Sequence, residues 1–329
     1  MFLGIDTSCY TTSLAIVDDQ GRLLADERQL LAVKQGERGL RQSEGLFMHV
    51  QNLPELAAAV KKKLPALKLK AVAASDRPRP VQGSYMPVFT AGASFGRTLA
   101  SLLQLPYWNL SHQEGHILAG IWSAGVSWTD FYVLHVSGGT TELLAVKLAG
   151  RIEIKKLGGS ADLHAGQFID RIGVALGLPF PAGPALEKLA QTAAEPIRVP
   201  VAVKDGEISF SGPESHVQRL VAAKKATPAA IARGVEHCIG KSLLALIENM
   251  TAAHGQKPVL FVGGVMANNY ICRLLRAELG ELCAFARTVY AGDNAVGAAL
   301  FARQKFTAQA GYEKGRRKSK LGEEIKHHQ

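Results

Sequence analysis

Runs of β-forming residues open the chain. The segments FLGID (residues 2–6), SCYTTSLAIV (residues 8–17) and RLLADE (residues 22–27) have strand-like patterns, and DDQG lies before the third as a turn. Gly and Asp bound these runs, as they bound strands in antiparallel sheets. The pattern therefore predicts a β-meander at the N-terminus.

Helical patterns then alternate with short buried strands. Strands are expected at 69–74 and at PVLFVGG (258–264), and a loop interrupted by Pro and Gly at 75–87. Helices are expected at 43–63, 93–104, 165–176, 183–190, 229–253, from 267 onward and from about 291 to 305. This alternation predicts an α/β protein in which the last helix crosses back to the N-terminal part of the chain.

The opening pattern returns in the middle of the chain. Placing residue 11 on residue 140 aligns TTSLAIVDDQGRL with TTELLAVKLAGRI, with six identities in thirteen positions. An apolar strand with a small polar turn precedes each copy, FLGIDTS in one and VLHVSGG in the other. Either two unrelated hairpins share common turn residues, or one hairpin unit is duplicated.

The duplication resembles the two-lobed actin/Hsp70/sugar-kinase (ASKHA) fold, with one hairpin in each lobe. We therefore expect a first lobe of residues 1–110 with 291–312, a second lobe of residues 111–290 that holds the metal and nucleotide site, and a basic tail at 313–329. The cleft between the lobes is the expected site.

Composition is that of an ordinary globular protein. Of its residues, 47% are hydrophobic and 20% are charged, and a length of 329 residues is enough for two packed domains. None of the four cysteines forms a C-x-x-C pair, and the chain begins directly with a strand-like segment. No apolar run approaches the roughly 20 residues that cross a bilayer. These features predict a cytoplasmic, thiol-reduced protein.

Positive charge gathers at the C-terminal end. The last sixteen residues contain six Lys or Arg and two Glu, and so supply +4 of the net charge of +10. Two interpretations stay open: a solvated end, or a contact with a phosphate backbone, because clustered cations gain affinity for polyanions by releasing counterions.

His112 and His116 form the strongest chemical motif. Their spacing of four residues in SHQEGHILAGI places both imidazoles on one face of a helix, where they can share one divalent cation. The alternative is a pair of exposed or helix-capping histidines. Zinc-protease chemistry is disfavoured, because Glu114 lies two positions after His112 and points roughly 200° around the helix, whereas H-E-x-x-H has its acid at the next position.

Seven motifs together resemble the TsaD/Gcp family, the tRNA N6-adenosine threonylcarbamoyltransferases once mislabelled as sialoglycoprotein endopeptidases. They occur in the family's order and span nearly the whole chain: GIDTSCYTTS (4–13), HQEGH (112–116), VSGGTTE (136–142), FIDRIGVALGLPFPAGPALEKLA (168–190), ISFSG (208–212), VGGVMANN (262–269) and GDNAVGAA (292–299).

The resemblance implies a metal held by His112, His116 and Asp293, and iron or zinc suits such nitrogen and oxygen ligands. Archaeal and eukaryotic members have a tyrosine ligand where this chain has His135. His135 is therefore either an additional ligand or a strand-end histidine bonded to its neighbours.

A nucleotide site is also implied. Most of the residues that would form it are small or polar. They are His135, Val136, Ser137, Gly138, Gly139, Asp170, Gly183 and Asn268. The glycines allow the backbone N–H groups to approach phosphate oxygens. Asp170 matches the family acid that holds the ribose hydroxyls. The alternative roles are turns and helix caps.

The implied reaction transfers threonylcarbamoyl from threonylcarbamoyl-AMP to N6 of the adenosine next to the anticodon in tRNA. Asp6 and Ser8 are the candidate catalytic residues, and TsaB- or TsaE-like proteins are the expected partners. Tyr10 and Thr11, however, stand where the family has two carboxylates, and neither is an acid at neutral pH.

Other departures from the family lie nearby. Arg77 and Arg79 occupy a proline-rich loop that is either a replacement anion-binding loop or a solvated one, and Gln167 replaces a further carboxylate. Two hypotheses follow: a transferase, or a non-catalytic nucleotide- or metal-binding paralogue that acts as a partner subunit. A small-molecule kinase ranks last, since only Asp6 is available to direct phosphate chemistry.

Overall fold

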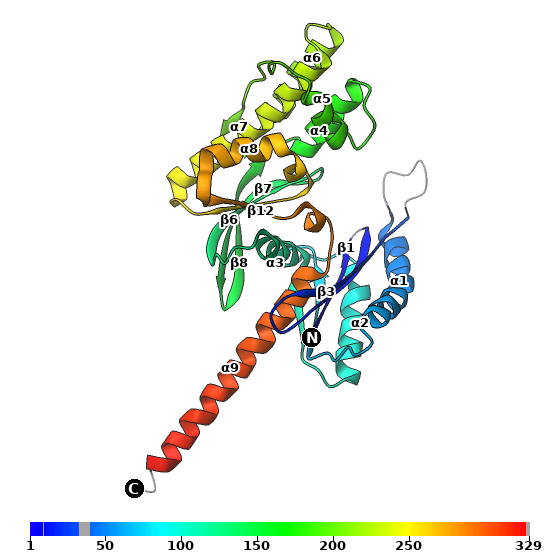
Figure 1. Cartoon of the computed structure of the whole chain (residues 1–329), viewed down its shortest axis with the longest axis vertical. Coiled ribbons are helices and arrows are strands. Elements are labelled where there is room, and N and C mark those ends of the chain that lie inside the picture. The colour runs from blue at the N-terminus through cyan, green and yellow to red at the C-terminus, as the bar shows by residue number, and fades with distance from the viewer. Residues whose placement is uncertain (9, 33–39, 327–329) are drawn as a thin grey trace. The chain divides into compact units, whose positions relative to one another are not determined.

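The computed structural model describes residues 1–8, 10–32 and 40–326, and divides into two compact units (Figure 1). Unit 1 contains Met1–Ala119 and Asp293–Gln329, and unit 2 contains Gly120–Gly292. The expected boundary between residues 110 and 111 is therefore displaced, because the helix that carries both metal-site histidines begins within unit 1. The metal residues consequently lie in the first unit instead of the second.

A five-stranded sheet with the order β3-β2-β1-β4-β5 forms unit 1. The strands are β1 (Phe2–Ser8), β2 (Thr11–Val17), β3 (Leu23–Leu30), β4 (Ala71–Arg77) and β5 (Tyr107–Ser111). The first three are antiparallel, as the β-meander predicts, and β4 and β5 continue the sheet in parallel with β1.

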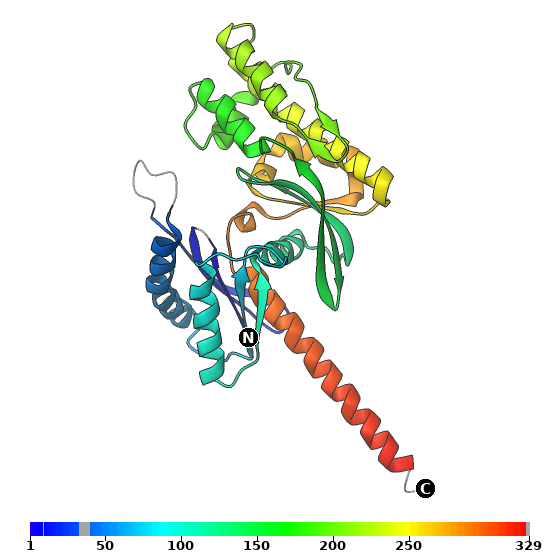
Figure 2. The ribbon, with the colours of Figure 1, turned by 180° about the vertical axis from the view of Figure 1, so that it is seen from behind.

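Helices cover both faces of this sheet. Helices α1 (Gln42–Lys63) and α2 (Phe89–Leu102) pack on one face (Figure 2). On this face Gly92 of α2 lies directly against Ile5 and Thr7. Helix α9 (Val296–Lys326) packs on the other, where Gly4 leaves room for its backbone. Successive residues of a strand point to opposite faces, and every residue of β1 is buried, so β1 is covered on both sides.

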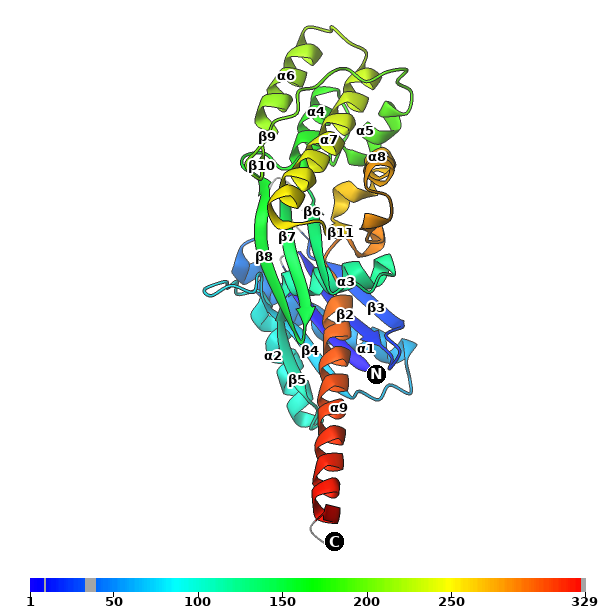
Figure 3. The same cartoon turned by 90° about the vertical axis from the view of Figure 1, so that its left-hand side faces the viewer.

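Unit 2 contains a seven-stranded sheet with the order β12-β11-β6-β7-β8-β10-β9. Its long strands are β6 (Asp130–Val136), β7 (Thr141–Ala149) and β8 (Arg151–Ser160), which lie side by side in Figure 3. The shorter strands are β9 (Val203–Lys204), β10 (Glu207–Ile208), β11 (Val259–Val262) and β12 (Cys283–Phe285).

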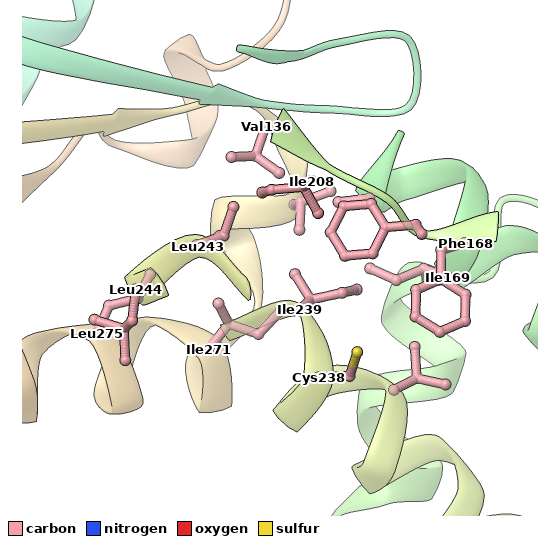
Figure 4. Close-up of a cluster of buried hydrophobic side chains, with 14 of the residues drawn as sticks. Val136, Phe168, Ile169, Ile208, Cys238, Ile239, Leu243, Leu244, Ile271 and Leu275 are labelled. Carbon is pink, nitrogen blue, oxygen red and sulfur yellow. The ribbon is translucent and has the colours of Figure 1, made fainter. Parts of the chain in front are cut away.

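Five helices and their apolar side chains complete unit 2. They are α4 (Ala165–Ala175), α5 (Gly183–Ala190), α6 (Ser211–Ala222), α7 (Pro228–His254) and α8 (Asn269–Leu279). Figure 4 shows Phe168 of α4, Ile239 of α7 and Ile271 of α8 meeting in one buried cluster with Val136 of β6. This core fixes α4 against the end of β6.

The two sheets repeat one design. The order β3-β2-β1-β4-β5 in unit 1 matches β8-β7-β6-β11-β12 in unit 2, with three antiparallel strands followed by two parallel ones in each. The predicted duplication of the hairpin and the two-lobed α/β fold are confirmed.

The last helix differs from its expected range of 291–305. Helix α9 begins at Val296 and continues to Lys326, through most of the segment expected to be a tail (Figure 1). Its first turns are buried against the sheet, and the ring of Phe306 contacts that of Phe2 with centroids 5.6 Å apart.

Two glycines of α9 provide a test of its packing. A Cβ at Gly297 would collide with the backbone of Gly115 on α3 (His112–Ala124), whereas a Cβ at Gly311 would meet nothing within 4 Å. We expect Gly297→Ala to lower the free energy of unfolding by about 1–3 kcal/mol through overpacking. Gly311→Ala should leave it unchanged or raise it by up to about 1 kcal/mol through helix propensity.

Denaturant unfolding of both variants checks this expectation. Equal effects of the two substitutions would contradict the close contact between α3 and α9.

Candidate functional site

Three ligand atoms converge at one point of unit 1. The Nε2 atoms of His112 and His116 lie 2.9 Å apart, and Asp293 Oδ1 lies 3.4 Å from the first and 3.5 Å from the second. Tetrahedral ligands with bonds of about 2.0–2.1 Å to zinc are separated by about 3.3 Å. The donor types and their spacing therefore fit one divalent cation.

The local fold explains this convergence. Strand β5 ends at Ser111, and α3 begins at His112, so both histidines fall on the first turn and a half of a helix. The Glu114 carboxylate accepts hydrogen bonds from the Ser111 N–H at 2.6 Å and from its hydroxyl at 2.7 Å, which holds the start of α3. The contact between Gly115 and Gly297 then brings the segment with Asp293 beside His116.

Asp6 holds the other side of the His112 ring. Its carboxylate is 1% exposed and lies 3.1 and 3.2 Å from His112 Nδ1. It also accepts hydrogen bonds from the hydroxyls of Ser8, at 2.7 Å, and Ser75. A carboxylate that accepts the second N–H of a histidine fixes the ring orientation and leaves Nε2 free to bind metal. Asp6 thus has the geometry of a positioning residue.

Charges at the site favour a cation between the acids. Burial opposes protonation of His112, but the carboxylates of Asp6 and Asp293 raise the imidazole pKa well above its usual value. Burial likewise opposes the charge on Asp293, but hydrogen bonds and attraction from both histidines hold its pKa well below the usual range. A divalent ion can take the place of the proton that the two imidazoles share with the Asp293 carboxylate.

The remaining predicted residues of unit 1 have structural partners. Ser8 contacts Asp6, so both proposed catalytic residues adjoin His112. Arg77 pairs with Asp76 at 2.5 Å and approaches Glu114 at 3.8 Å, which favours neither of the two roles expected for its loop. Tyr10, which replaces a family carboxylate, is 42% exposed.

His49 was not predicted from the sequence. It is completely buried on α1, and its Nδ1 lies 2.8 Å from the Thr12 hydroxyl, which accepts a hydrogen bond from Asn52. Its Nε2 has no hydrogen-bond partner among the described residues. Burial lowers its pKa to about 4 against the opposing attraction of Asp6 and Asp293, so the ring is neutral at pH 7.

A small loop and a helix start meet in unit 2. The loop of Ser137, Gly138 and Gly139 connects β6 to β7, and the Gly166 N–H donates to the Ser137 carbonyl at 3.2 Å. Both loop glycines are exposed, with free space around their Cα atoms. Because α4 begins at Ala165, its N-terminal end lies at this loop, where helix N–H groups favour anions such as phosphate.

The other predicted nucleotide residues lie on elements adjoining α4. Asp170 accepts a hydrogen bond from the Ala182 N–H at 2.7 Å, directly before Gly183 at the start of α5. Asn268 caps α8 by accepting from the Ile271 N–H at 2.9 Å, and its amide donates to buried Glu236 at 2.5 Å. The alternative role of helix cap therefore holds for Asn268, and its nucleotide role stays a prediction.

Glu236 is a second residue that the sequence did not reveal. Burial raises its pKa to about 7, although Asn268 and Arg233 favour its charged form. It links α7 to the start of α8 through Asn268. A buried acid in the middle of a long helix has no sequence motif that would identify it.

His135 and Val136 end β6 in unit 2, where they pair with Glu142 and Thr141 of β7. The backbone at Gly263, with φ +103°, lies against Val136 and the His135 ring. Because His135 belongs to the other unit, the geometry of the three ligand residues does not test it as an additional ligand. That role stays a prediction.

The family model for TsaD, tRNA N6-adenosine threonylcarbamoyltransferase, matches residues 47–300. The chain belongs to the TsaD family. The matched region includes both metal-site histidines, Asp293 and all of unit 2, so it supports a transferase of this type or a related paralogue.

Solved structures similar to this TsaD-family chain share its fold at low sequence identity. HypF of T. kodakarensis matches with 16% identity and a TM-score of 0.60, over 94% of this chain and 48% of that one. Component A of (R)-2-hydroxyglutaryl-CoA dehydratase from Acidaminococcus fermentans matches with 16% identity and a TM-score of 0.55, over 93% and 98%.

A ROK-family glucokinase from Streptomyces griseus, in complex with glucose and AMPPNP, matches with 14% identity and a TM-score of 0.51, over 92% of this chain and 99% of that one. These matches support the ASKHA-type fold with its two sheets. Within the described part of this TsaD-family chain, no helix is long and apolar enough to span a bilayer.

Metal analysis of purified variants tests the three-residue centre. His112→Ala should abolish stoichiometric zinc or iron, because it removes a ligand, whereas His237→Ala, whose ring bonds Tyr270 in unit 2, should retain it. Asp6→Asn should weaken zinc affinity by roughly 10–100-fold through loss of ring orientation. Full metal content in the His112 variant would contradict the site.

The burial of His49 predicts a pH-dependent contribution to stability. Its folded pKa of about 4 lies below the ordinary value of 6.5, so the unfolded chain binds the proton first as pH falls. The stability of the wild type relative to His49→Asn should therefore decrease between pH 6.5 and 4. Asparagine keeps an acceptor for Thr12 but does not titrate.

Unfolding in denaturant across this pH range measures the difference. Thr12→Val, which removes the hydroxyl partner and keeps the imidazole, should lower stability at every pH and preserve the slope. A wild-type advantage independent of pH would show that His49 does not titrate as expected.

Proposed function

We propose that this protein transfers the threonylcarbamoyl group from threonylcarbamoyl-AMP to N6 of the adenosine next to the anticodon in tRNA. One observation carries the proposal: the converging Nε2 atoms of His112 and His116 and the carboxylate of Asp293, backed by Asp6, in a TsaD-family chain. Two imidazoles with a carboxylate suit iron or zinc, although the donor set does not choose between them.

His112, His116 and Asp293 would hold this ion, which would supply Lewis-acid polarisation of the carbamoyl or phosphate oxygens. Asp6 fixes the His112 ring through Nδ1, so the ligand nitrogen keeps its direction during turnover. The loop of Ser137–Gly139, with the start of α4, would bind the AMP phosphate.

The bonds that form and break in the transfer show that the reaction also needs a proton acceptor. The adenine amine forms a bond to the carbamoyl carbon, the bond from that carbon to the phosphate oxygen breaks, and AMP leaves. The amine must also lose a proton. Asp6 already accepts from Ser8, Ser75 and His112 and is poorly placed to take it. The departing phosphate, whose second pKa is about 6, is the acceptor in this proposal.

A second candidate is a non-catalytic subunit that binds metal or nucleotide and pairs with a true transferase. It is favoured by one observation: the first hairpin has Tyr10 and Thr11 in place of the two family carboxylates, and its remaining acid, Asp6, is fully engaged. TsaB- and TsaE-like proteins are the natural partners to test under either candidate.

Purified protein loaded with zinc or iron, threonylcarbamoyl-AMP and unmodified tRNA distinguish the two candidates. Nucleoside analysis should detect threonylcarbamoyl-adenosine with the wild type, alone or with TsaB- and TsaE-like proteins. Its yield should fall by at least about tenfold with His112→Ala, because loss of the bound ion removes Lewis-acid stabilisation of roughly several kcal/mol. His237→Ala is the matched control and should retain activity.

No modified adenosine under any of these conditions, from protein that binds its metal, would reject the transferase and support the subunit.

A further inference from the structure

An apolar cavity lies in unit 1 between the sheet and the C-terminal halves of α1 and α2. Its volume is about 480 Å³, within the range of about 300–1,000 Å³ that small-molecule sites have. Leu3 of β1 and Leu14 and Ile16 of β2 form its floor, and all three are buried. Leu3 lies near the start of β1 and Asp6 near its end, so the cavity and the metal centre use different parts of the strand.

The walls of the cavity are apolar side chains that the rest of unit 1 leaves partly exposed. Ala57 of α1 lines one side, and Phe95 and Leu99 of α2 line another. Leu67 and Leu69, from the segment that follows α1, close a third side. Each of these side chains packs against the buried core of the sheet and is only partly buried itself. A concave apolar surface that stays in contact with water favours an apolar ligand.

The open side of the cavity is positively charged. Among the described residues that line the cavity, only Lys61 and Lys68 are charged, and both side chains are exposed. Lys61 lies on the last turn of α1, and its ammonium donates to the Pro65 carbonyl at 2.6 Å. The backbone beside Lys68 is fixed, since the Lys70 N–H donates to the Met1 carbonyl at 2.8 Å. Charge complementarity therefore favours a ligand with an anionic head.

We propose that this cavity binds a linear medium-chain carboxylate, such as decanoate. The alkyl chain lies between the sheet, α1 and α2, where it exchanges water for apolar walls. The carboxylate stays at the open side and accepts charge-assisted hydrogen bonds from the ammonium groups of Lys61 and Lys68. The site uses no residue of the metal centre or of the nucleotide loop, so it does not depend on the proposed transferase.

The shape of the site favours a single chain over a membrane surface. A helix that binds a bilayer from one side inserts a protruding apolar face into the lipid. Here the apolar residues surround a hollow on three sides and above a floor of strands, so they enclose one ligand chain instead of projecting into a bilayer.

A variant that fills the cavity tests the apolar part of the site. Ala57→Phe places a ring in the cavity, whereas Ala58→Phe places the same ring at the next position of α1, which is exposed and does not line the cavity. Titration calorimetry of the full chain with hexanoate, octanoate and decanoate, below their micellar concentrations, measures binding. Wild-type affinity should rise roughly tenfold for each two methylene groups added. Ala57→Phe should abolish the binding of decanoate, and Ala58→Phe should retain it.

Neutral lysine variants test the charged part. Lys61→Gln combined with Lys68→Gln should weaken octanoate binding by about fivefold at low salt, because two exposed charge pairs are lost. The wild type should bind octanoate more tightly than octan-1-ol, and the double variant should lose this preference. The matched control combines Lys62→Gln with Lys225→Gln, which are exposed and outside the cavity, and should bind both probes as the wild type does.

All of these variants should keep the wild-type metal content, which shows that unit 1 is folded. If Ala57→Phe does not fold, the lysine pair and the chain-length series decide the question. An affinity that is independent of chain length, equal binding of octanoate and octan-1-ol by the wild type, or an equal loss in either control would overturn the proposal. Binding of phosphatidylglycerol vesicles without any binding of free decanoate would assign the surface to a membrane and would also overturn it.

Discussion

The hydrogen bond between Asp6 and His112 is the interaction on which the rest of the site depends. Asp6 lies on the central strand of unit 1, buried on both faces, and its carboxylate is fixed by Ser8 and Ser75. It orients the His112 ring so that Nε2 meets His116 and Asp293. A buried carboxylate is strongly unfavourable without partners, so this cluster is stable only as a set.

The departures from the family pattern differ in whether they affect the contacts that hold Asp6 and the three ligand residues. Tyr10 and Thr11 replace acids at the turn of the hairpin, outside the contacts that hold the three ligands, so their change leaves the metal geometry intact. The loop at Ser137 and the start of α4 are held by a separate core in unit 2. The residues proposed for metal binding and those proposed for nucleotide binding are therefore held in place by separate sets of contacts.

Much of the fold could be predicted from periodicity. The repeat of TTSLAIV as TTELLAV predicted one β-hairpin in each lobe, and these hairpins are β1–β2 and β6–β7, while the matching order of the other strands was not predicted. The expected boundary near 110 differs from the one at residues 119 and 120, because the first part of α3 packs against α9 through Gly115 and Gly297, a contact that no local pattern reveals. Helix α9 was predicted too short, since its polar second half has no apolar period to read.

The candidate site was predictable only where motifs carried it. The spacing of His112 and His116 indicated a shared ligand face, and the family resemblance supplied Asp293. The sequence did not indicate His49 and Glu236, because a polar residue that is buried on a helix cannot be told from an exposed one until its neighbours are known. Asp170 and Asn268 are candidates through the family resemblance, and their nucleotide role stays a prediction, while their contacts with Ala182 and Glu236 follow from tertiary packing alone.

X-ray absorption spectroscopy of the protein loaded with one equivalent of zinc tests the central claim most directly. The account predicts a first shell of nitrogen and oxygen at about 2.0–2.1 Å, with the outer-shell scattering of two imidazoles and no sulfur. A shell that contains sulfur at about 2.3 Å, or one without imidazole scattering, would show that zinc binds elsewhere and would contradict the centre formed by His112, His116 and Asp293.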